Sequence, residues 1–245
     1  MHYGPDLAAI HDSAFAFTAE SGADVLVGAV RRAFPDGGLV VDLGCGSGIL
    51  SRALTDAGYD VLGVDISPAM VRLARARAPK ATFRAGSILD VDIPSCVAVA
   101  AVGEIVNYAG ARPAKGKRGG LSALARLFRR LHAALEPGGV FLFDSAGPGR
   151  GGPEGRREIF RDDEDWSMHV VIEERGRTLT RDMAIFRKAG KAYRRTDEHH
   201  DLALYRPDDV EARLRAAGFA VRRLRRYAEL RLPAGLTGFL ATKRG

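Results

Sequence analysis

The sequence is poor in cysteine and has no long apolar run. Only two cysteines occur among its 245 residues, and no apolar stretch approaches the roughly twenty residues that a membrane-spanning helix needs. We expect no signal peptide at the start of the chain. Cys45 and Cys96 lie in apolar surroundings on or near predicted strands, so both are predicted to be buried, reduced thiols. These absences exclude a disulfide framework and a membrane span, and they favour a cytoplasmic protein.

Acidic residues are also in the minority. Lysine and arginine number 37 against 30 aspartates and glutamates, which gives a formal net charge of +7. Most of the positive charge is arginine scattered along predicted helices and strands. The densest run, residues 222–226, would put its charges on both faces of an edge strand, and no aromatic platform for stacking bases lies nearby. A solvated edge is therefore favoured over a nucleic-acid groove, and charge alone does not indicate a nucleic-acid enzyme.

Residues 39–50, LVVDLGCGSGIL, are the most informative stretch of the chain. An apolar run that suits a strand buried on both faces ends in Asp42, and three alternate glycines and a helix-forming segment follow. Glycines let the backbone turn sharply and let a ligand approach it, and the next helix points its N-terminus at that ligand. A dinucleotide fingerprint would need glycine where Ile49 stands. A plain glycine turn is the alternative interpretation.

Asp65 ends a second apolar run, about twenty residues beyond the glycines, where βαβ nucleotide sites carry an acidic residue that accepts ribose hydroxyls. Ser67 and Pro68 then begin a predicted helix, with a capping hydroxyl and a proline at the first helical position. Asp65 could also be a plain helix-entry carboxylate. The glycines upstream favour the ribose role.

The Asp-x-Gly-x-Gly-x-Gly pattern resembles the first motif of the class I methyltransferases that use S-adenosylmethionine, of the small-molecule type. Residues 81–88 resemble the third strand of that family and the turn beside the adenine ring. Residues 97–108 resemble its fourth strand and substrate-facing end, and residues 136–144 its proline-glycine turn and fifth strand. The resemblance runs from about Tyr3 to the end of the chain. It implies an α/β fold: a Rossmann-like, seven-stranded, mostly parallel sheet with helices on both faces, plus an antiparallel β cap inserted after the fifth strand.

The chain length fits a single methyltransferase domain. We expect four parts: an N-terminal helical closing segment (1–37), a cofactor-binding core (38–145), the β cap (146–205), and a C-terminal helix with the last two strands (206–245).

Within these parts, the leucine spacing over 121–135 predicts a helix. The cap is predicted as three strands joined by glycine turns, and a plain sheet extension is the alternative. A final helix is expected from Arg206 to near Gly218. Glycine-rich residues 109–120 and 147–155 are predicted as loops. The expected strands of the cap and C-terminus are 169–173, 178–186, 193–205, 219–230 and 236–242.

Methyl transfer requires the acceptor to be aligned and water to be excluded, and it needs a base only if the acceptor arrives protonated. On a strand, Glu198 and His200 share a face while His199 points away. The family resemblance suggests a Glu-x-His pair at this strand, and it places His11 where relatives often carry tyrosine. A paired surface strand or a structural histidine is the alternative.

The resemblance thus yields a set of candidate site residues. Ser87 stands where many relatives carry an acidic residue. No metal site is predicted, and the acidic run 162–165 is interpreted as a solvated loop. The catalytic candidates are His200, Glu198 and His11; the cofactor candidates are Tyr3, Asp42, Gly44, Cys45, Gly46, Gly48, Asp65, Ile66, Met70, Gly86, Ser87, Ile88 and Gly103; the acceptor candidates are Glu104, Asn107 and Tyr108.

The leading hypothesis is an enzyme that moves a methyl group from S-adenosylmethionine to an oxygen or nitrogen of a small molecule, leaving S-adenosylhomocysteine. One alternative is an RNA methyltransferase, motivated by the basic balance and the Lys-Gly-Lys-Arg segment 115–118. Another is a methyltransferase fold that binds cofactor without catalysis. Neither the acceptor nor the oligomeric state, monomer or homodimer, follows from the sequence.

Overall fold

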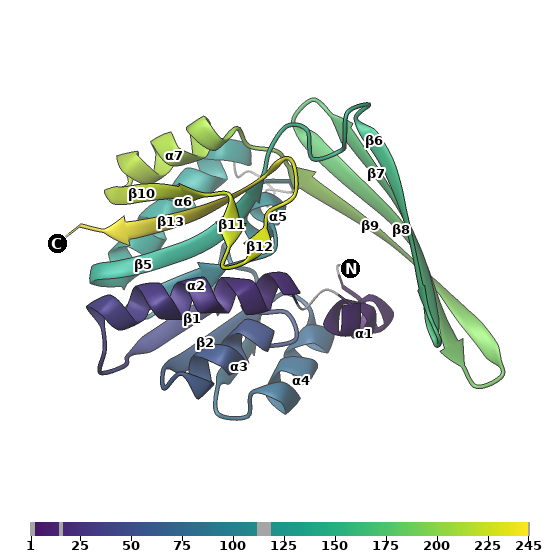
Figure 1. Cartoon of the computed structure of the whole chain (residues 1–245), viewed down its shortest axis with the longest axis horizontal. Coiled ribbons are helices and arrows are strands. Elements are labelled where there is room, and N and C mark those ends of the chain that lie inside the picture. Colours follow the sequence, from purple (N-terminus) through teal and green to yellow (C-terminus); the bar gives the residue numbers. More distant parts are fainter. Residues whose placement is uncertain (1–2, 15–16, 112–118, 245) are drawn as a thin grey trace.

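The structure, a computed structural model, describes residues 3–14, 17–111 and 119–244, and its centre is a seven-stranded sheet. The strand order is β10-β13-β5-β4-β1-β2-β3 (Figure 1). The first five strands in the chain pair in parallel, and β13 runs antiparallel to both of its neighbours. This confirms the predicted mostly parallel sheet. The strands are β1 (Leu39–Leu43), β2 (Asp60–Asp65), β3 (Thr82–Ala85), β4 (Cys96–Ala101), β5 (Leu135–Ala146), β10 (Phe219–Leu224) and β13 (Leu236–Lys243).

Helices cover both faces of this sheet, which is why its central strands are apolar at nearly every position. Successive residues of β5 pack to opposite sides: Phe141 and Phe143 join one hydrophobic cluster, whereas Val140 and Leu142 join the other. The first cluster includes α5 (Ile105–Ala111), α6 (Gly120–Ala134) and α7 (Pro207–Ala216); the second includes α2 (Phe17–Ala33) and α3 (Ile49–Asp56); α4 (Pro68–Arg77) packs beside α3.

The helix predicted from leucine spacing over 121–135 is α6. Its buried residues recur at helical spacing, so one stripe faces the sheet. Of the predicted loop 109–120, residues 109–111 end α5 and Gly120 begins α6, while residues 112–118, with the basic segment 115–118, lie outside the described residues. No helix in the described ranges is long and apolar enough to cross a membrane.

The cap is an antiparallel meander of four strands: β6 (Arg156–Asp163), β7 (Trp166–Arg175), β8 (Thr178–Ala189) and β9 (Ala192–Ala203). The three-strand prediction was wrong by one strand. β6 was missed because it is an edge strand with mostly exposed residues and little apolar alternation. The acidic run 162–165 is therefore the end of β6 and a hairpin turn, although its side chains are exposed as expected.

The predicted strand 219–230 is also interrupted. The edge strand β10 ends at Leu224, and a separate small hairpin follows, formed by β11 (Arg226–Tyr227) and β12 (Leu230–Arg231). Ala228 in its turn has φ +43°, a backbone conformation that the residue type gave no reason to expect.

The N-terminal helix α1 (Pro5–Ala14) lies between the cap and the core (Figure 1). Leu7 and Ile10 pack into the hydrophobic cluster of the cap. Asp6 pairs with Arg194 of β9 and accepts a hydrogen bond of 2.8 Å from Thr196 Oγ1. The N-terminal segment therefore contacts the inner face of the cap.

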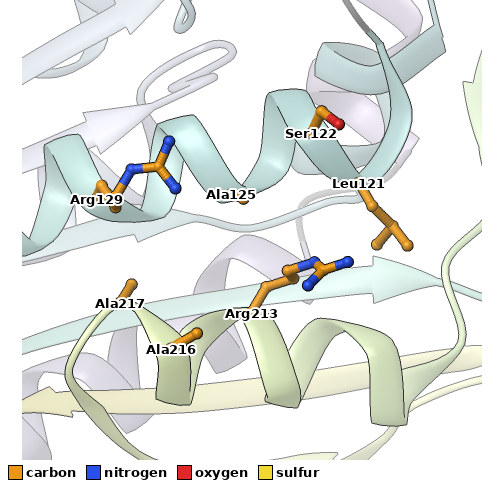
Figure 2. A pocket seen from close by; sticks show the side chains of 7 residues that line it. All are labelled: Leu121, Ser122, Ala125, Arg129, Arg213, Ala216 and Ala217. Atoms are coloured by element: carbon orange, nitrogen blue, oxygen red, sulfur yellow. The ribbon is translucent and has the colours of Figure 1, made fainter.

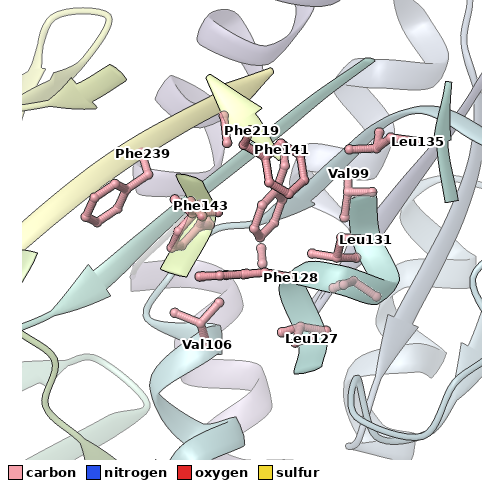
Figure 3. Packing of buried hydrophobic residues seen from close by; sticks show 14 of the residues in the cluster. Val99, Val106, Leu127, Phe128, Leu131, Leu135, Phe141, Phe143, Phe219 and Phe239 are labelled. Carbon is pink, nitrogen blue, oxygen red and sulfur yellow. The ribbon is translucent and has the colours of Figure 1, made fainter. Parts of the chain in front are cut away.

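Four phenylalanines form the centre of the first cluster (Figure 3). The ring of Phe143 stacks on Phe141 at 4.5 Å between centroids and on Phe239 at 5.0 Å, and Phe128 of α6 lies 5.5 Å away. These rings join the strands β5 and β13 to helix α6.

Phe143→Ala should lower the free energy of unfolding by about 3–5 kcal/mol, because a fully buried aromatic ring leaves a cavity that its neighbours cannot fill. The control Phe186→Ala removes a ring that is 37% exposed on the cap and should cost less than about 1 kcal/mol. Urea denaturation of both variants measures the difference. Equal losses would contradict the central role of the ring stack.

Candidate active site

The predicted glycine turn connects β1 to α3. Gly48 immediately precedes the helix, and a Cβ there would come within 2.9 Å of Ala74 Cα in α4. Gly46 has the opposite surroundings: a Cβ on it would meet no atom of the described residues within 4 Å. Glycine thus permits close helix packing at one position and leaves the backbone open to a ligand at the other.

Asp65 closes this turn from the end of β2. Its carboxylate accepts hydrogen bonds from Gly46 N at 2.9 Å and from Ser67 N at 2.8 Å. Burial raises the pKa of Asp65. Each carboxylate oxygen has a second acceptor position, so Asp65 can still receive two hydroxyl groups.

A cavity of about 200 Å³ lies between the carboxyl ends of the parallel strands and the cap. Parallel sheets hold ligands at this edge. Ile66 lines the cavity and is 58% exposed, which offers an apolar surface to a flat ring. Seven predicted residues line it (Tyr3, Gly44, Asp65, Ile66, Ser87, Ile88, Tyr108), together with four that the prediction missed (Leu89, Ile105, Ala111, Asp201).

The remaining cofactor candidates lie beneath this cavity. The Met70 side chain is buried, and its N–H donates to the capping hydroxyl of Ser67. Gly86 N donates to the Asp65 carbonyl at 2.9 Å, and Gly103 N donates to Asp144 at 2.9 Å. Cys45 packs among buried apolar side chains. These residues shape the turns around the cavity.

A different cavity, of about 170 Å³, lies between α6 and α7 (Figure 2). It shares no lining residue with the cavity at the sheet edge, and it presents alanines and arginines without a carboxylate or imidazole. We therefore place the active site at the sheet edge. The residues around the α6–α7 cavity are Leu121, Ser122, Ala125, Arg129, Arg213, Ala216 and Ala217.

Glu198 and His200 lie side by side on the inner face of β9. His200 Nε2 is 2.9 Å from Glu198 Oε2, and His200 Nδ1 is 3.1 Å from the Tyr108 hydroxyl. Glu198 also accepts N–H bonds from Tyr3 at 2.8 Å and Gly4 at 2.6 Å. Tyr108, His200 and Glu198 are thus connected by hydrogen bonds. His200 is only 1% exposed, whereas Tyr108 lines the cavity.

His11 of α1 joins the same group. Its ring lies 5.4 Å from that of Tyr3, and the Tyr3 ring lies 5.1 Å from that of His200. Burial lowers the pKa of His11 to about 4, so this imidazole is neutral near pH 7. The neighbouring Asp12 instead pairs with Arg77 of α4.

Two acceptor candidates have other partners. Asn107 is fully buried, and its side-chain amide bonds the backbone of Ala146 and Ala203. Glu104 has φ +62° and pairs with Arg150 and Arg181. Neither arginine was predicted as a site residue, because arginine is scattered along the whole chain. The available signal was the position of Arg150 in the glycine-rich segment after the fifth strand.

Comparison with known proteins agrees with this geometry. A family model described as "Methyltransferase domain" matches residues 40–139. The putative methyltransferase YqeM of Bacillus subtilis is 26% identical over 207 residues, covering 80% of this chain and 78% of that protein. The dTDP-3-amino-3,4,6-trideoxy-alpha-D-glucopyranose N,N-dimethyltransferase of Streptomyces venezuelae is 27% identical over 207 residues, covering 78% and 79%. A solved S-adenosylmethionine-dependent methyltransferase from Clostridium acetobutylicum superposes with a TM-score of 0.81 at 19% identity, covering 97% of this chain and 98% of that one.

The chain belongs to the class I S-adenosylmethionine-dependent methyltransferases. The family, the Rossmann-like fold and the cofactor predicted from the sequence are thereby confirmed.

The chemistry of the residues around this cavity is compatible with S-adenosylmethionine, the cofactor of the family. At Gly46, Gly86 and Gly103 a Cβ would meet no atom of the described residues within 4 Å, so the backbone of these turns is open to a ligand. Ile66 supplies an apolar surface and Asp65 a hydroxyl acceptor. When bound, the cofactor supplies an electrophilic methyl group on a sulfonium.

Asp42→Asn should change how the stability of this methyltransferase depends on pH. Burial raises the pKa of Asp42 to about 7, whereas an unfolded aspartate titrates near pH ~4. Between these values the folded protein holds a proton that the unfolded chain releases, so this group makes the free energy of unfolding fall as pH rises. Asparagine removes that contribution and still accepts from Ser51, which donates to Asp42 at 2.7 Å.

Denaturation of both proteins at about pH 5 and about pH 8 measures this effect. The stability of the wild type relative to Asp42→Asn should be greater at the lower pH. A relative stability that does not change with pH would contradict the raised pKa.

Proposed function

We propose that this methyltransferase transfers a methyl group to a nitrogen or oxygen of a small molecule bound under the cap. The observation that carries the proposal is the hydrogen-bonded row of Tyr108, His200 and Glu198, of which Tyr108 lines the cavity. The Streptomyces venezuelae relative, whose name gives an amino sugar as its substrate, supports an amine as the first acceptor to test.

The cofactor would be held by the glycine turn and the ends of β2 and β3. In this proposal Asp65 accepts the ribose hydroxyls, while Ile66 and Ile88 lie against the adenine ring. Ser87 contributes its backbone and hydroxyl at the ring edge. Tyr3 closes the methionine side of the cavity, because its carbonyl accepts from Ser67 Oγ at 2.6 Å and fixes the N-terminal segment to α4.

Proton removal would use Tyr108 of α5 together with His200 and Glu198 of the cap strand β9. Glu198 accepts from His200 Nε2, which leaves Nδ1 as the acceptor for the Tyr108 hydroxyl. As the acceptor molecule gives a proton to the Tyr108 oxygen, Tyr108 passes its own proton to Nδ1, and Glu198 stabilises the resulting imidazolium. His11, neutral and buried beside Tyr3, helps to exclude water.

The covered site favours a small acceptor over RNA, since α1 and the cap lie over the carboxyl edge of the sheet. In this proposal residues 1–37 close the site, 38–145 bind cofactor, 146–205 cover the acceptor, and 206–245 complete the sheet. The buried free thiols Cys45 and Cys96 support a cytoplasmic location.

Asp65→Ala should weaken binding of S-adenosylhomocysteine by at least about tenfold, because two charge-assisted hydrogen bonds to ribose are lost. Asp60→Ala at the exposed start of the same strand is the matched control and should bind as the wild type does. Calorimetric titration measures both variants. Retained affinity in Asp65→Ala would reject the ribose role.

His200→Ala and Tyr108→Phe should each lower kcat about 10²–10⁴-fold if the acceptor arrives protonated. Affinity for S-adenosylhomocysteine should stay within a few-fold of the wild type. His199→Ala is the control, because His199 lies on the outer face and pairs with Asp182 and Asp201. Formation of S-adenosylhomocysteine with a panel of amines, amino sugars and phenols gives the rates. Unchanged turnover in both variants would reject the proton path.

A further inference from the structure

The inner face of the cap carries a row of four side chains, three of them basic, that leads to the active site. Arg157 of β6, Ile172 of β7, Arg181 of β8 and His200 of β9 are direct partners in the strand register. Side chains directly opposite one another in an antiparallel sheet lie on one face. The row therefore ends at His200, one contact from the cavity.

Around Arg181 of this row, arginine side chains outnumber carboxylates. Arg150 Nε donates to one oxygen of Glu104 at 2.6 Å, and Arg181 donates to the other oxygen. The side chains of Arg150 and Arg181 are 13% and 15% exposed, and that of Glu104 is 8% exposed. A single buried carboxylate is thus already shared by two guanidinium groups.

Arg157 adds a third guanidinium to this cluster. The Nε atom of Arg157 is buried, and this atom has no hydrogen-bond partner in the described part of the chain. Burial and the charges of Arg150 and Arg181 lower the pKa of Arg157. Buried charges of one sign are costly unless a counter-charge arrives.

The carboxylates of Glu174 and Asp144 bind backbone groups: Glu174 accepts N–H bonds from Gly149 and Gly151, and Asp144 accepts them from Gly103 and Glu104. Neither accepts from Arg157 Nε, which has no partner among the described residues and can donate to a ligand.

We propose that Arg157, together with Arg150 and Arg181, binds an anionic oxygen group of the methyl acceptor, a phosphate or a carboxylate. Arginine presents a planar fork that matches both groups. Arg181 also interacts with Tyr108, so the anion would sit on the cap side of the cavity, beside the reacting part of the acceptor. This inference rests on the proposed function and adds the charge of the substrate to it.

The test uses the full chain saturated with S-adenosylhomocysteine, at constant ionic strength. Pyrophosphate and malonate are titrated separately by calorimetry as probes for the two kinds of group. We expect at least one probe to bind, and Arg157→Gln to weaken that binding by about tenfold or more. Arg157→Lys keeps the charge but loses the planar fork, so its affinity for the probe should lie between that of the wild type and that of Arg157→Gln.

Arg156→Gln is the matched control. Arg156 is the neighbouring residue on the opposite face of β6, where it pairs with Glu158 and Glu173, so its loss should leave probe binding unchanged. Preference for pyrophosphate would assign a phosphate-bearing acceptor, and preference for malonate a carboxylate-bearing one. Binding of neither probe, or equal weakening by Arg156→Gln, would overturn the inference.

The same titrations separate this inference from the proposed function. If the wild type fails to bind S-adenosylhomocysteine, the proposed function fails first. If it binds S-adenosylhomocysteine but neither anion, the anionic subsite alone is rejected.

Discussion

Buried carboxylates that accept pairs of backbone N–H groups hold the loops of this site together. Asp65 accepts from Gly46 and Ser67, and Glu198 accepts from the first two described residues of the N-terminal segment. Asp144 binds the turn after β4 in the same way. In a parallel sheet the carboxyl ends of strands leave amides without ladder partners, and such amides must be satisfied when they are buried. A carboxylate satisfies two at once, so each loop has a defined shape before any ligand binds.

Burial and hydrogen bonding have opposite effects on the pKa of these buried carboxylates, and their balance differs between Asp144 and Glu198. Burial raises the pKa of Asp144 to about 6, although two backbone amides stabilise its charge. The pKa of Glu198 is lowered instead: burial again acts to raise it, but His200 and the amides of Tyr3 and Gly4 outweigh that effect. Asp144 also accepts from the Tyr227 hydroxyl, but it is more deeply buried than Glu198 and the charge of Glu104 raises its pKa further. Glu198 therefore remains a carboxylate next to the imidazole, which is the state that can stabilise a proton on His200.

The turn between β1 and α3 and the start of α4 could be predicted from the sequence because their determinants are local. The glycine turn, Asp65 and the Ser67 cap act on residues within one βαβ unit, so residue type and spacing define them. The acceptor side depends on contacts across the chain, such as that of Glu104 with Arg181, 77 residues away. No local pattern marks such a pair. Strand β6 was missed for a related reason: of its two apolar residues only Ile159 packs into the hydrophobic cluster of the cap, while Phe160 is 68% exposed.

Helix α1 is attached to the cap and the core mainly by apolar contacts. Asp6 is buried, but its partners Arg187 and Arg194 are 41% and 57% exposed, and ion pairs that reach water contribute only about 0–1 kcal/mol. At the other end of α1 the Asp12–Arg77 pair is also partly solvated. Leu7 and Ile10 supply most of the attachment through apolar burial. Tyr3 and Gly4 donate to Glu198 directly, and Glu198 bonds His200. The position of the N-terminal segment and the orientation of His200 are therefore linked through the same carboxylate.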